Sequence, residues 1–313
     1  MKLSVIIPVF NGEKTIERCI KSALSQTVSD FEIIVVNDGS NDKTPDIMEQ
    51  IKDSRVKVIM QQNRGQGLAR NAGLDAAKGE YIGFLDADDT IESGMYEKMR
   101  AAAAEYNADI VQCNLTDIYS DGKRITQLSD FEGLAEARNA AEYMSRYMAG
   151  YIHSYEVCNK IFRRDFLERN KLRFKDTKKY FSEDILFNME AVKCSPRVFF
   201  IKEPYYNYYQ NSDSHMHMGR DRLNKMLDLF DDYISEADSE MKISASYLAA
   251  MVTMYNIGEC NGALPQNAVK RLKEYIKNAK SADMPLKKRL YLTAAGMSGE
   301  KIILRLAKVL NRG

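Results

Sequence analysis

Runs of apolar residues, many of them β-branched, alternate with segments of helical periodicity over the first 85 residues of the chain. Four runs are predicted to be strands: Leu3 to Phe10, Phe31 to Asn37, Val56 to Met60 and Tyr81 to Leu85. Strands that are hydrophobic throughout are typical of a parallel sheet whose two faces are both buried by connecting helices. We therefore expect an α/β fold in which helices flank a mainly parallel sheet.

The segments between and after these runs carry helix and turn signals. Helices are predicted over residues 13–26, 44–52 and 68–77, the second with Thr44 as N-cap and Pro45 at its first position. A helix over residues 95–106, a strand over 109–115 and a hairpin turn at Asp121-Gly122 follow. From about residue 219 only helical periodicity remains, and Pro265 and Pro285 stand where helices would begin.

Composition narrows the functional classes. The 313 residues, 45% of them hydrophobic, are enough for one large domain and a smaller one. Lys and Arg total 45 against 44 for Asp and Glu, so the charge balance gives no reason to expect nucleic acid as a partner. The five cysteines form no Cys-x-x-Cys pair, and residues 1–4 run into a strand without a signal-like apolar region. No segment is apolar over a bilayer's thickness. A cytoplasmic protein is expected.

Polar residues follow the first two predicted strands. The first exit reads Pro8-Val9-Phe10-Asn11-Gly12, and the second reads Asn37-Asp38-Gly39-Ser40. Open α/β sheets bind ligands beyond the carboxyl ends of their strands, and Asp38 could accept a hydrogen bond from a base or ribose. Taken alone, each segment is better explained as an ordinary turn, with Asn11 in the first one capping the next helix.

Three carboxylates crowd into Asp86-Ala87-Asp88-Asp89 at the end of the fourth strand. Neighbouring carboxylates raise one another's pKa unless a cation offsets their charge. Mg²⁺ or Mn²⁺, held by one or two carboxylates, water and substrate phosphates, would do so and would neutralise a leaving diphosphate. A solvated acidic turn explains the triplet equally well.

A further acidic pair, Glu183-Asp184, follows Ser182 at the start of a predicted helix. Acids there complement the helix dipole, but a carboxylate remote from the acidic triplet could also take a proton from an acceptor hydroxyl. Two other motifs carry less weight. Gly65-Gln66-Gly67 does not follow the first strand, which disfavours nicotinamide binding, and His215-Met216-His217 is better explained as a surface loop than as a metal site.

Four motifs occur in order along the chain: Val5-Ile6-Ile7-Pro8-Val9-Phe10-Asn11, Ile34-Val35-Val36-Asn37-Asp38-Gly39-Ser40, Ala69-Arg70-Asn71-Ala72-Gly73 and Gly79 to Asp89. Taken together, they closely resemble family 2 glycosyltransferases of the bacterial polysaccharide type, which have the GT-A fold. The resemblance is highly specific over about the first hundred residues. It extends more loosely through Ser182-Glu183-Asp184 to about residue 210, and the last third of the chain resembles no family.

The resemblance implies a role for each matching residue. It places Phe10 against the nucleotide base, Asp38 on that base, commonly uracil, and Arg70 along the nucleotide pocket. Asp86 and Asp88 would be the acids of the DXD motif, with Asp88 and Asp86 holding Mn²⁺ or Mg²⁺. The general base would be Asp184, or Glu183 beside it. Pro8, Asn11 and Ala87 complete the nucleotide-sugar site. The basic residue that the family often carries near Gln210-Asn211-Ser212-Asp213 is missing.

The implied activity is inverting transfer of a hexose or N-acetylhexosamine from a nucleotide-sugar, in particular a UDP-sugar. The acceptor would be a saccharide or lipid-linked oligosaccharide in cell-surface polysaccharide synthesis. Residues 1–218 would be the catalytic domain, with nucleotide-sugar binding in 1–115 and the acceptor side and base in 116–218, followed by a helical domain over 219–313. A sugar nucleotidyltransferase, or an inactive saccharide-binding protein of the same fold, is the alternative.

The end of the chain is basic. From residue 286 to 313 there are seven positive residues against Glu300 alone. Apolar residues at helical spacing could form one face of a basic amphipathic helix: Ile302, Ile303, Leu306, Val309 and Leu310. Such a helix suits peripheral contact with the cytoplasmic face of a membrane. The competing explanation is a helix that packs on its own domain.

Overall fold

The computed structural model describes residues 2–127, 129, 131–210, 220–259, 264–265 and 267–310. The chain divides into two compact units. The first comprises residues 1–135, 155–178 and 183–213, and the second comprises residues 136–154, 179–182 and 214–313. The segment 136–154, which precedes much of the sheet unit in sequence, thus belongs to the helical unit.

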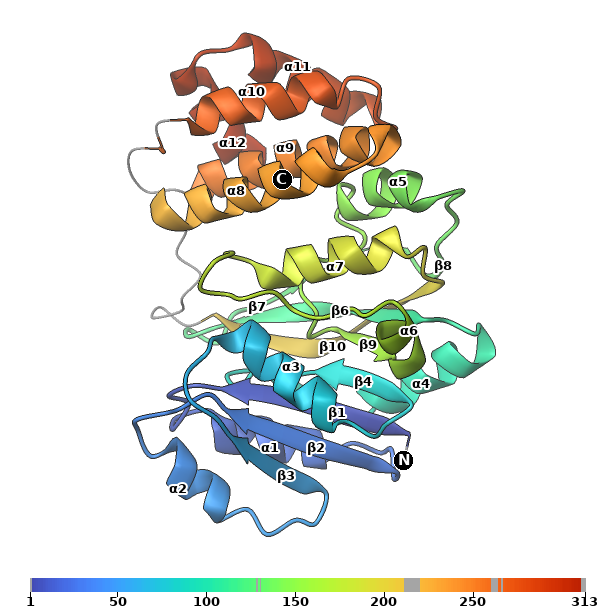
Figure 1. The fold of residues 1–313 in the computed structure, drawn as a ribbon, viewed down its shortest axis with the longest axis vertical. Coiled ribbons are helices and arrows are strands. Elements are labelled where there is room, and N and C mark those ends of the chain that lie inside the picture. The colour runs from blue at the N-terminus through green and yellow to red at the C-terminus, as the bar shows by residue number, and fades with distance from the viewer. Residues whose placement is uncertain are drawn as a thin grey trace. The chain divides into compact units, whose positions relative to one another are not determined.

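The described residues of the first unit form a ten-stranded sheet (Figure 1). Its main path runs β3 (Val56–Met60), β2 (Phe31–Asn37), β1 (Leu3–Val9), β4 (Tyr81–Phe84), β9 (Lys160–Arg163), β6 (Ile110–Tyr119), β10 (Val198–Gln210) and β5 (Thr90–Ile91). β7 (Arg124–Gln127) pairs with β6, and β8 (Gly133–Leu134) pairs with β10. The four strands predicted from the first 85 residues are present, and the α/β fold is confirmed.

Strand direction changes halfway across the sheet. β3, β2, β1 and β4 are parallel to one another, whereas β9 is antiparallel to both β4 and β6. The sheet is therefore parallel in its first half and mixed in its second. The turn predicted at Asp121-Gly122 joins the antiparallel pair β6 and β7, and Gly122 has a φ of 83° that favours glycine.

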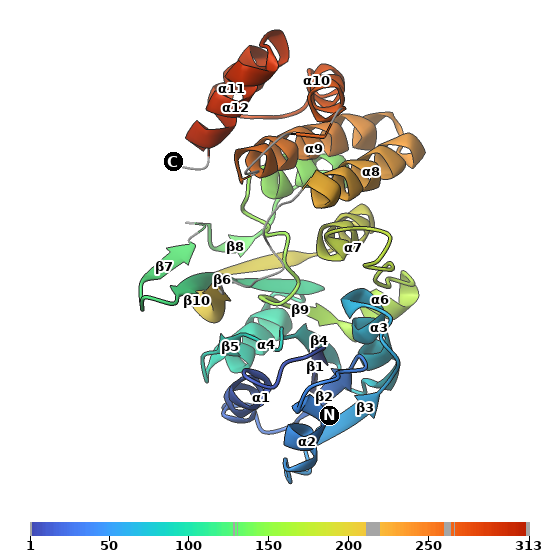
Figure 2. The same cartoon turned by 90° about the vertical axis from the view of Figure 1, so that its left-hand side faces the viewer.

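Helices cover both faces of the sheet, as Figure 2 shows. α1 (Ile16–Leu24) and α4 (Met95–Glu105) pack in one apolar cluster with alternate residues of β1, while α3 (Gln66–Ala76) packs on the other face. α1 begins three residues later than predicted, because residues 13–15 form a turn closed by hydrogen bonds to the Gly12 carbonyl. Thr44 lies inside α2 (Thr44–Glu49) rather than capping it, and its hydroxyl accepts from the Gly12 amide.

The second unit is built around α9 (Ser239–Glu259), which contacts α8 (Arg220–Glu236), α10 (Ala268–Asn278) and α12 (Glu300–Leu310). α5 (Ala140–Tyr143) and the π-helical turn Met144–Met148 also pack on α9, and α11 (Leu286–Met297) packs on α10. The predicted helical C-terminal region is present. None of the helices in the described part of the chain is long and apolar enough to cross a membrane. The four cysteines described there, Cys19, Cys113, Cys158 and Cys194, are free thiols.

Candidate functional site

The exits of β1, β2 and β4 gather at one edge of the sheet. β1 pairs in parallel with β2 on one side and β4 on the other, so the carboxyl ends of all three strands point the same way. The first two exits are also tied to each other: the Asn11 amide donates to Ser40 Oγ at 2.9 Å, and the Asn41 amide donates to Asn11 Oδ1 at 2.9 Å. The predicted ligand segments therefore form one continuous rim.

The residues of the first exit differ in their exposure. Pro8 lies buried within β1, whereas the Phe10 side chain is 46% exposed and its ring is open to stacking. Asn11 has a φ of 53°, which turns the chain sharply after Phe10. The suggestion that Asn11 caps the next helix is wrong, because Thr15 holds the N-cap position of α1 and the Asn11 side chain bonds to Asn41.

Asp38, at the exit of β2, is 3% exposed and accepts three hydrogen bonds from the protein. Its Oδ1 accepts from Gln61 Nε2 at 2.6 Å and from the Arg64 amide at 2.9 Å, while its Oδ2 accepts from the Gly65 amide at 2.8 Å. Gly65 immediately precedes α3. The Asp38 carboxylate therefore holds the loop that leads into the helix carrying Arg70.

The acids of the fourth exit are not equivalent. Asp89 is fully buried; its Oδ2 accepts from the Tyr206 hydroxyl at 2.6 Å and its Oδ1 from the Tyr209 amide at 2.8 Å. Burial, with the nearby charges of Asp88 and Asp86, raises the pKa of Asp89 well above its ordinary value. Asp89 thus fixes the loop to β10, whereas Asp86 and Asp88 are the partly exposed acids of the triplet.

The backbone of the acidic loop is also held by two side chains of α1. From α1, Cys19 Sγ donates to the Asp86 carbonyl at 3.4 Å, and Arg18 Nη2 donates to the Asp88 carbonyl at 2.6 Å. The Arg18 guanidinium also lies 3.7 Å from the centre of the Tyr209 ring on β10. These anchors could not be predicted from the sequence, since a cation on an exposed helix turn is usually only solvated.

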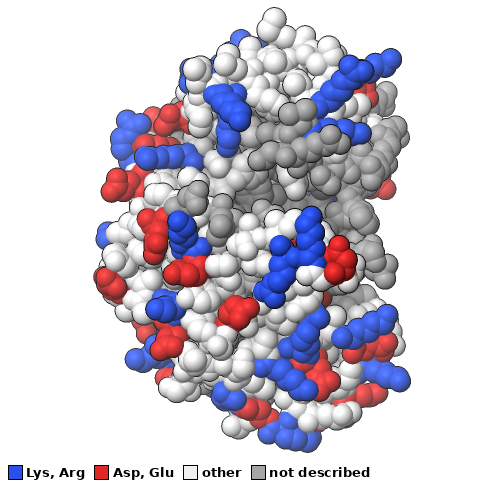
Figure 3. Space-filling model, turned by 180° about the vertical axis from the view of Figure 1, so that it is seen from behind, with Lys and Arg blue, Asp and Glu red and all other residues white. Residues whose placement is uncertain are grey.

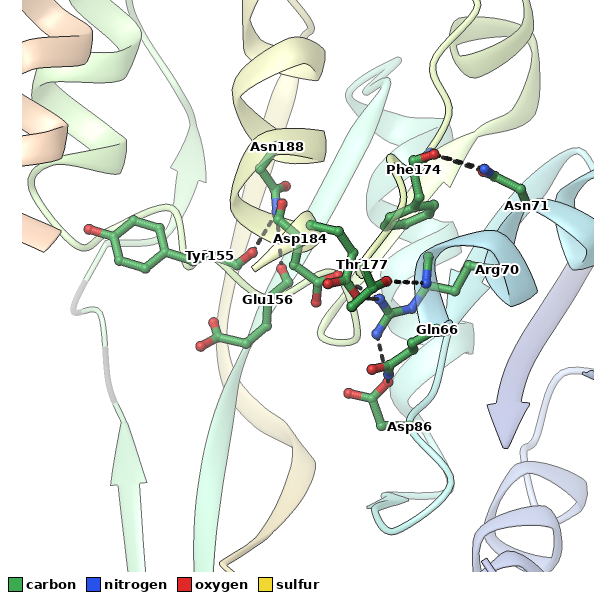
Figure 4. Close-up of polar contacts among 12 residues, drawn as sticks. Gln66, Arg70, Asn71, Asp86, Tyr155, Glu156, Phe174, Thr177, Asp184 and Asn188 are labelled. Carbon is green, nitrogen blue, oxygen red and sulfur yellow. Dashed lines mark hydrogen bonds and ion pairs between the residues drawn. The ribbon is translucent and has the colours of Figure 1, made fainter. Parts of the chain in front are cut away.

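The centre of the site is Arg70 on α3, which brings together acids from α7 and from the loop after β4 (Figure 4). Its Nη1 donates to Glu183 Oε1 at 2.8 Å and to Asp184 Oδ1 at 2.6 Å, both on α7 (Glu183–Lys193). Its Nη2 donates to Asp86 Oδ1 at 2.9 Å, next to β4. The Arg70 side chain is 1% exposed. Asp86, predicted for the donor site, and Glu183 and Asp184, the two candidates for the general base, thus share one buried guanidinium.

Burial and charge act against each other in this cluster. Burial disfavours the charge of Arg70, but the carboxylates of Asp184, Asp86 and Glu183 outweigh it and raise its pKa. Burial raises the pKa of Asp184, and the positive charge of Arg70 opposes that rise. A carboxyl whose pKa is shifted by its surroundings and faces a ligand-binding rim is a candidate for proton transfer.

Residues 4–170 match the sequence model of glycosyl transferase family 2, which is more than half of the chain. The chain belongs to this family. The glycosyltransferase EpsJ of Bacillus subtilis (strain 168), itself uncharacterized, is 37% identical over 216 residues, which are 68% of this chain and 62% of EpsJ. The succinoglycan biosynthesis protein ExoO of Rhizobium meliloti (strain 1021) is 34% identical over 198 residues, 62% of this chain and 57% of ExoO. The match therefore spans about three fifths of each relative.

Solved structures share the fold. S. aureus TarS 1-349 in complex with UDP-GlcNAc superposes with a TM-score of 0.69 at 23% identity, covering 100% of this chain and 92% of that one. The mannosyltransferase PcManGT from Pyrobaculum calidifontis, in complex with GDP-Man and Mn²⁺, has a TM-score of 0.61 at 16% identity and covers 99% of this chain and 87% of that one. At such identities the likeness establishes the fold.

In this member of family 2, residues outside the four family motifs complete the surroundings of Arg70. Gln66 Nε2 donates to Asp86 Oδ1 at 3.0 Å, and the Phe174 ring centre lies 5.2 Å from the Arg70 guanidinium carbon. The Gly67 amide donates to Thr177 Oγ1 at 2.8 Å. A Cβ at Gly67 would lie 2.5 Å from the Lys175 carbonyl oxygen, so close packing requires glycine there. Residues 174–177 form no regular element, and no periodicity could have identified them.

Other buried polar residues lie close to Glu183 and Asp184, the two candidates for the general base. Asn188, one turn along α7, donates from Nδ2 to the Asp184 carbonyl at 3.0 Å and to the Tyr155 carbonyl at 2.7 Å. Lys160 on β9 is fully buried and donates to the Glu156 carbonyl and, at 3.1 Å, to Asn159 Oδ1. Burial lowers the pKa of Lys160 to about 8. Neither contact carries a motif that sequence reasoning would single out.

The acidic loop could supply only some of the ligands that a divalent ion needs. The described part of the chain holds no cluster of three or more His, Cys, Asp or Glu side chains arranged for a metal. Asp89 is buried and accepts hydrogen bonds from the Tyr206 hydroxyl and the Tyr209 amide, so the candidate metal ligands of this loop are Asp86 and Asp88. This set suits Mg²⁺ or Mn²⁺ that takes its other ligands from water and a diphosphate. His215 and His217, with residues 211–213, lie outside the described residues.

Proposed function

We propose that the chain is an inverting glycosyltransferase that transfers a hexose or N-acetylhexosamine from a UDP-sugar to a saccharide or lipid-linked oligosaccharide in polysaccharide synthesis. Family membership supports the reaction class. The observation that carries the proposal is the meeting of Asp86, Arg70 and Asp184 at the carboxyl edge of the sheet. The names of two similar proteins, a succinoglycan biosynthesis protein and a TarS bound to UDP-GlcNAc, support the substrate class.

In this proposal residues 1–115 bind the donor. The exposed ring of Phe10 stacks on the base, and Asp38, still bonded to its loop, offers remaining lone pairs to the base. Pro8, Asn11 and Ala87 shape the rim around the donor, and Arg70 lines it through Asp86. Residues 116–218 carry the acceptor side and the base, and residues 219–313 form the accompanying helical domain.

Asp88 and Asp86 would hold Mn²⁺ or Mg²⁺ together with the donor diphosphate. When bound, the ion supplies positive charge that stabilises the leaving nucleoside diphosphate. The resemblance assigns the metal to Asp88 first, and Asp86 Oδ1 already accepts from Arg70 Nη2 and Gln66 Nε2. Asp86 then positions the sugar or ribose while Arg70 keeps its charge balanced.

Asp184 would act as the general base. The acceptor hydroxyl oxygen attacks the anomeric carbon, the bond from that carbon to the diphosphate oxygen breaks, and the hydroxyl proton passes to the Asp184 carboxylate. Attack opposite the leaving group inverts the anomeric centre. Asp184 is favoured over Glu183 because its side chain is 21% exposed, against 7% for Glu183.

The test is a panel of UDP-, GDP- and dTDP-sugars with Mn²⁺, read as nucleotide binding and as nucleotide release with candidate acceptors. Asp184→Asn should keep UDP binding and lose roughly 10²- to 10⁴-fold in turnover. Asp88→Ala should lose Mn²⁺-dependent UDP binding, whereas Asp165→Asn, an exposed control on α6 (Arg164–Arg169), should change neither. The absence of nucleotide binding in the wild type would refute the proposal.

The reaction products distinguish the glycosyltransferase from the two alternative functions. A sugar nucleotidyltransferase would release pyrophosphate from a nucleoside triphosphate and a sugar phosphate, and an inactive saccharide-binding protein would turn over no donor. Because lipid-linked acceptors reside in membranes, we also propose that the enzyme works at the cytoplasmic face of the membrane, in peripheral contact with it.

A further inference from the structure

α11 has two different sides. Leu292 and Ala295 are buried within the helical unit, at 3% and 0% exposure. The opposite side exposes apolar residues at positions i, i+4, i+8 and i+11, which place them on one helix face: Leu286 (71%), Leu290 (62%), Ala294 and Met297 (85%). We call these four residues the α11 stripe. Isolated exposed apolar residues are ordinary, but a continuous row along one helix is a sign of a binding surface.

Positive charge borders the stripe. Lys287 and Arg289 are exposed, and as the residues just after Leu286 and just before Leu290 they flank the row on its two sides. Arg289 Nη2 also donates to the Ala282 carbonyl at 3.4 Å, but the residue stays exposed. Lys288 does not contribute, because it is half-buried and donates to the Ala149 carbonyl at 3.1 Å. Over residues 283–308 there are six positive residues against two negative ones. Figure 3 shows Lys and Arg side chains, in blue, beside uncharged surface on the upper part of one face of the molecule.

α12 adds charge rather than apolar surface. Ile303 and Ala307 are fully buried in contact with the unit's core, so the predicted apolar face of this helix is used mainly for packing. The outward residues are Ile302, Lys301, Arg305 and Lys308. The side chains of residues 309 and 310 lie outside the description. The sequence located the basic character correctly, but the exposed apolar row lies on α11.

We infer that the α11 stripe, with Lys287 and Arg289 beside it, is a docking surface for a bilayer containing anionic phospholipid. Apolar side chains enter the boundary between headgroups and acyl chains, while flanking cations meet the headgroup phosphates. A second copy of the chain fits less well, because a symmetric contact would bring the cations of one copy toward those of the other. The link from this surface to a lipid-linked acceptor rests on the proposed function, whereas the docking itself does not.

The test uses the full chain with vesicles of phosphatidylcholine alone and of phosphatidylcholine with phosphatidylglycerol, measured by co-sedimentation. The wild type should bind the anionic vesicles, and binding should weaken in high salt. Leu286→Ser/Leu290→Ser/Met297→Ser should reduce affinity at least roughly tenfold, given the area of three large side chains. The matched control is Val58→Ser/Met60→Ser on β3, whose side chains are 42% and 60% exposed.

Charge is tested separately. Lys287→Gln/Arg289→Gln should reduce binding to anionic vesicles, roughly fivefold per charge, and leave binding to neutral vesicles unchanged. Lys52→Gln/Lys98→Gln, which removes two exposed cations from the sheet unit, is the control and should bind as the wild type does.

Several results would overturn the inference: no vesicle binding by the wild type, equal binding by the stripe variant and its control, or a dimer in light scattering that the stripe variant abolishes. Mn²⁺-dependent UDP binding is measured in parallel. The stripe variant should retain it, so loss of vesicle binding with intact UDP binding isolates the surface. Vesicle binding by a wild type that binds no nucleotide would leave the docking surface standing and refute the proposed function.

Discussion

Replacing Arg70 by methionine removes the one cation shared by three carboxylates. Arg70 Nη1 and Nη2 lie 2.6 to 2.9 Å from oxygens of Asp184, Glu183 and Asp86, and the arginine side chain is 1% exposed. Removing one partner of a buried ion pair costs about 3–5 kcal/mol, because the remaining charge is left without compensation. Methionine keeps much of the apolar stem, so the loss in free energy of unfolding reports mainly the charge.

The same substitution should shift the pH dependence of catalysis. Burial raises the pKa of Asp184 and the charge of Arg70 opposes it, so removing Arg70 should raise this pKa further. A base must be ionised, and the rise of kcat/KM with pH should therefore move to higher pH by at least about one unit. A carboxyl with a raised pKa in the folded state stabilises the fold most at low pH, and this contribution is lost as the pH rises through that pKa. The destabilisation should accordingly be smaller at pH 5 than at pH 8.

Chemical unfolding at both pH values and a pH profile of nucleotide release measure these effects. Arg169→Met is the control: this arginine, 52% exposed, also meets two carboxylates, Asp109 and Asp165, and its loss should cost less than about 1 kcal/mol. Arg70→Met/Asp184→Asn should recover part of the stability because it removes one uncompensated charge. If Arg70→Met costs no more than the control and the pH profile stays in place, the reasoning about the cluster is wrong.

Three further substitutions test the loop and the sheet. Arg18→Met should weaken Mn²⁺-dependent UDP binding several-fold in titrations and barely change the melting temperature, since Arg18 is exposed and contacts the Asp88 carbonyl and the Tyr209 ring. Tyr206→Phe leaves buried Asp89 Oδ2 without its donor and should cost about 1–3 kcal/mol in denaturant unfolding. Burial raises the pKa of Glu32, but hydrogen bonds to its carboxylate outweigh burial and lower it. Glu32→Gln should therefore destabilise the fold at pH 7. This loss in free energy of unfolding should shrink as the pH falls below the ordinary pKa of the carboxyl and the wild-type group becomes protonated.

The first half of the sheet could be predicted because its signals are local. Each strand from β1 to β4 is a short apolar run, and the rule that parallel strands end at one edge brings Asn11, Asp38 and Asp86 together without further information. The second half follows no such rule. β9 inserts antiparallel between β4 and β6, although it lies 76 positions after the end of β4 in sequence, and no periodicity specifies that pairing.

The same distinction between local and distant information separates the predicted from the unexpected parts of the site. The motifs identified Arg70, Asp86 and Asp184 individually, and their assigned roles remain predictions. Their meeting depends on contacts across 113 and 114 positions of the chain, which only the packing of α3 and α7 decides. The division of labour within the acidic triplet likewise depends on Tyr206, a residue 117 positions from Asp89.

A buried cation shared by the two halves of the site has a consequence that neither half has alone. Asp86 follows β4 in the predicted nucleotide-binding half, and Asp184 lies in the first turn of α7 in the predicted acceptor half. A carboxylate oxygen of each accepts a hydrogen bond from the same Arg70 guanidinium. Any change that removes negative charge from Asp86 leaves more of the Arg70 charge to Asp184 and favours its ionised form. The donor loop and the base are therefore electrostatically coupled, and substitutions at the two acids should not be additive.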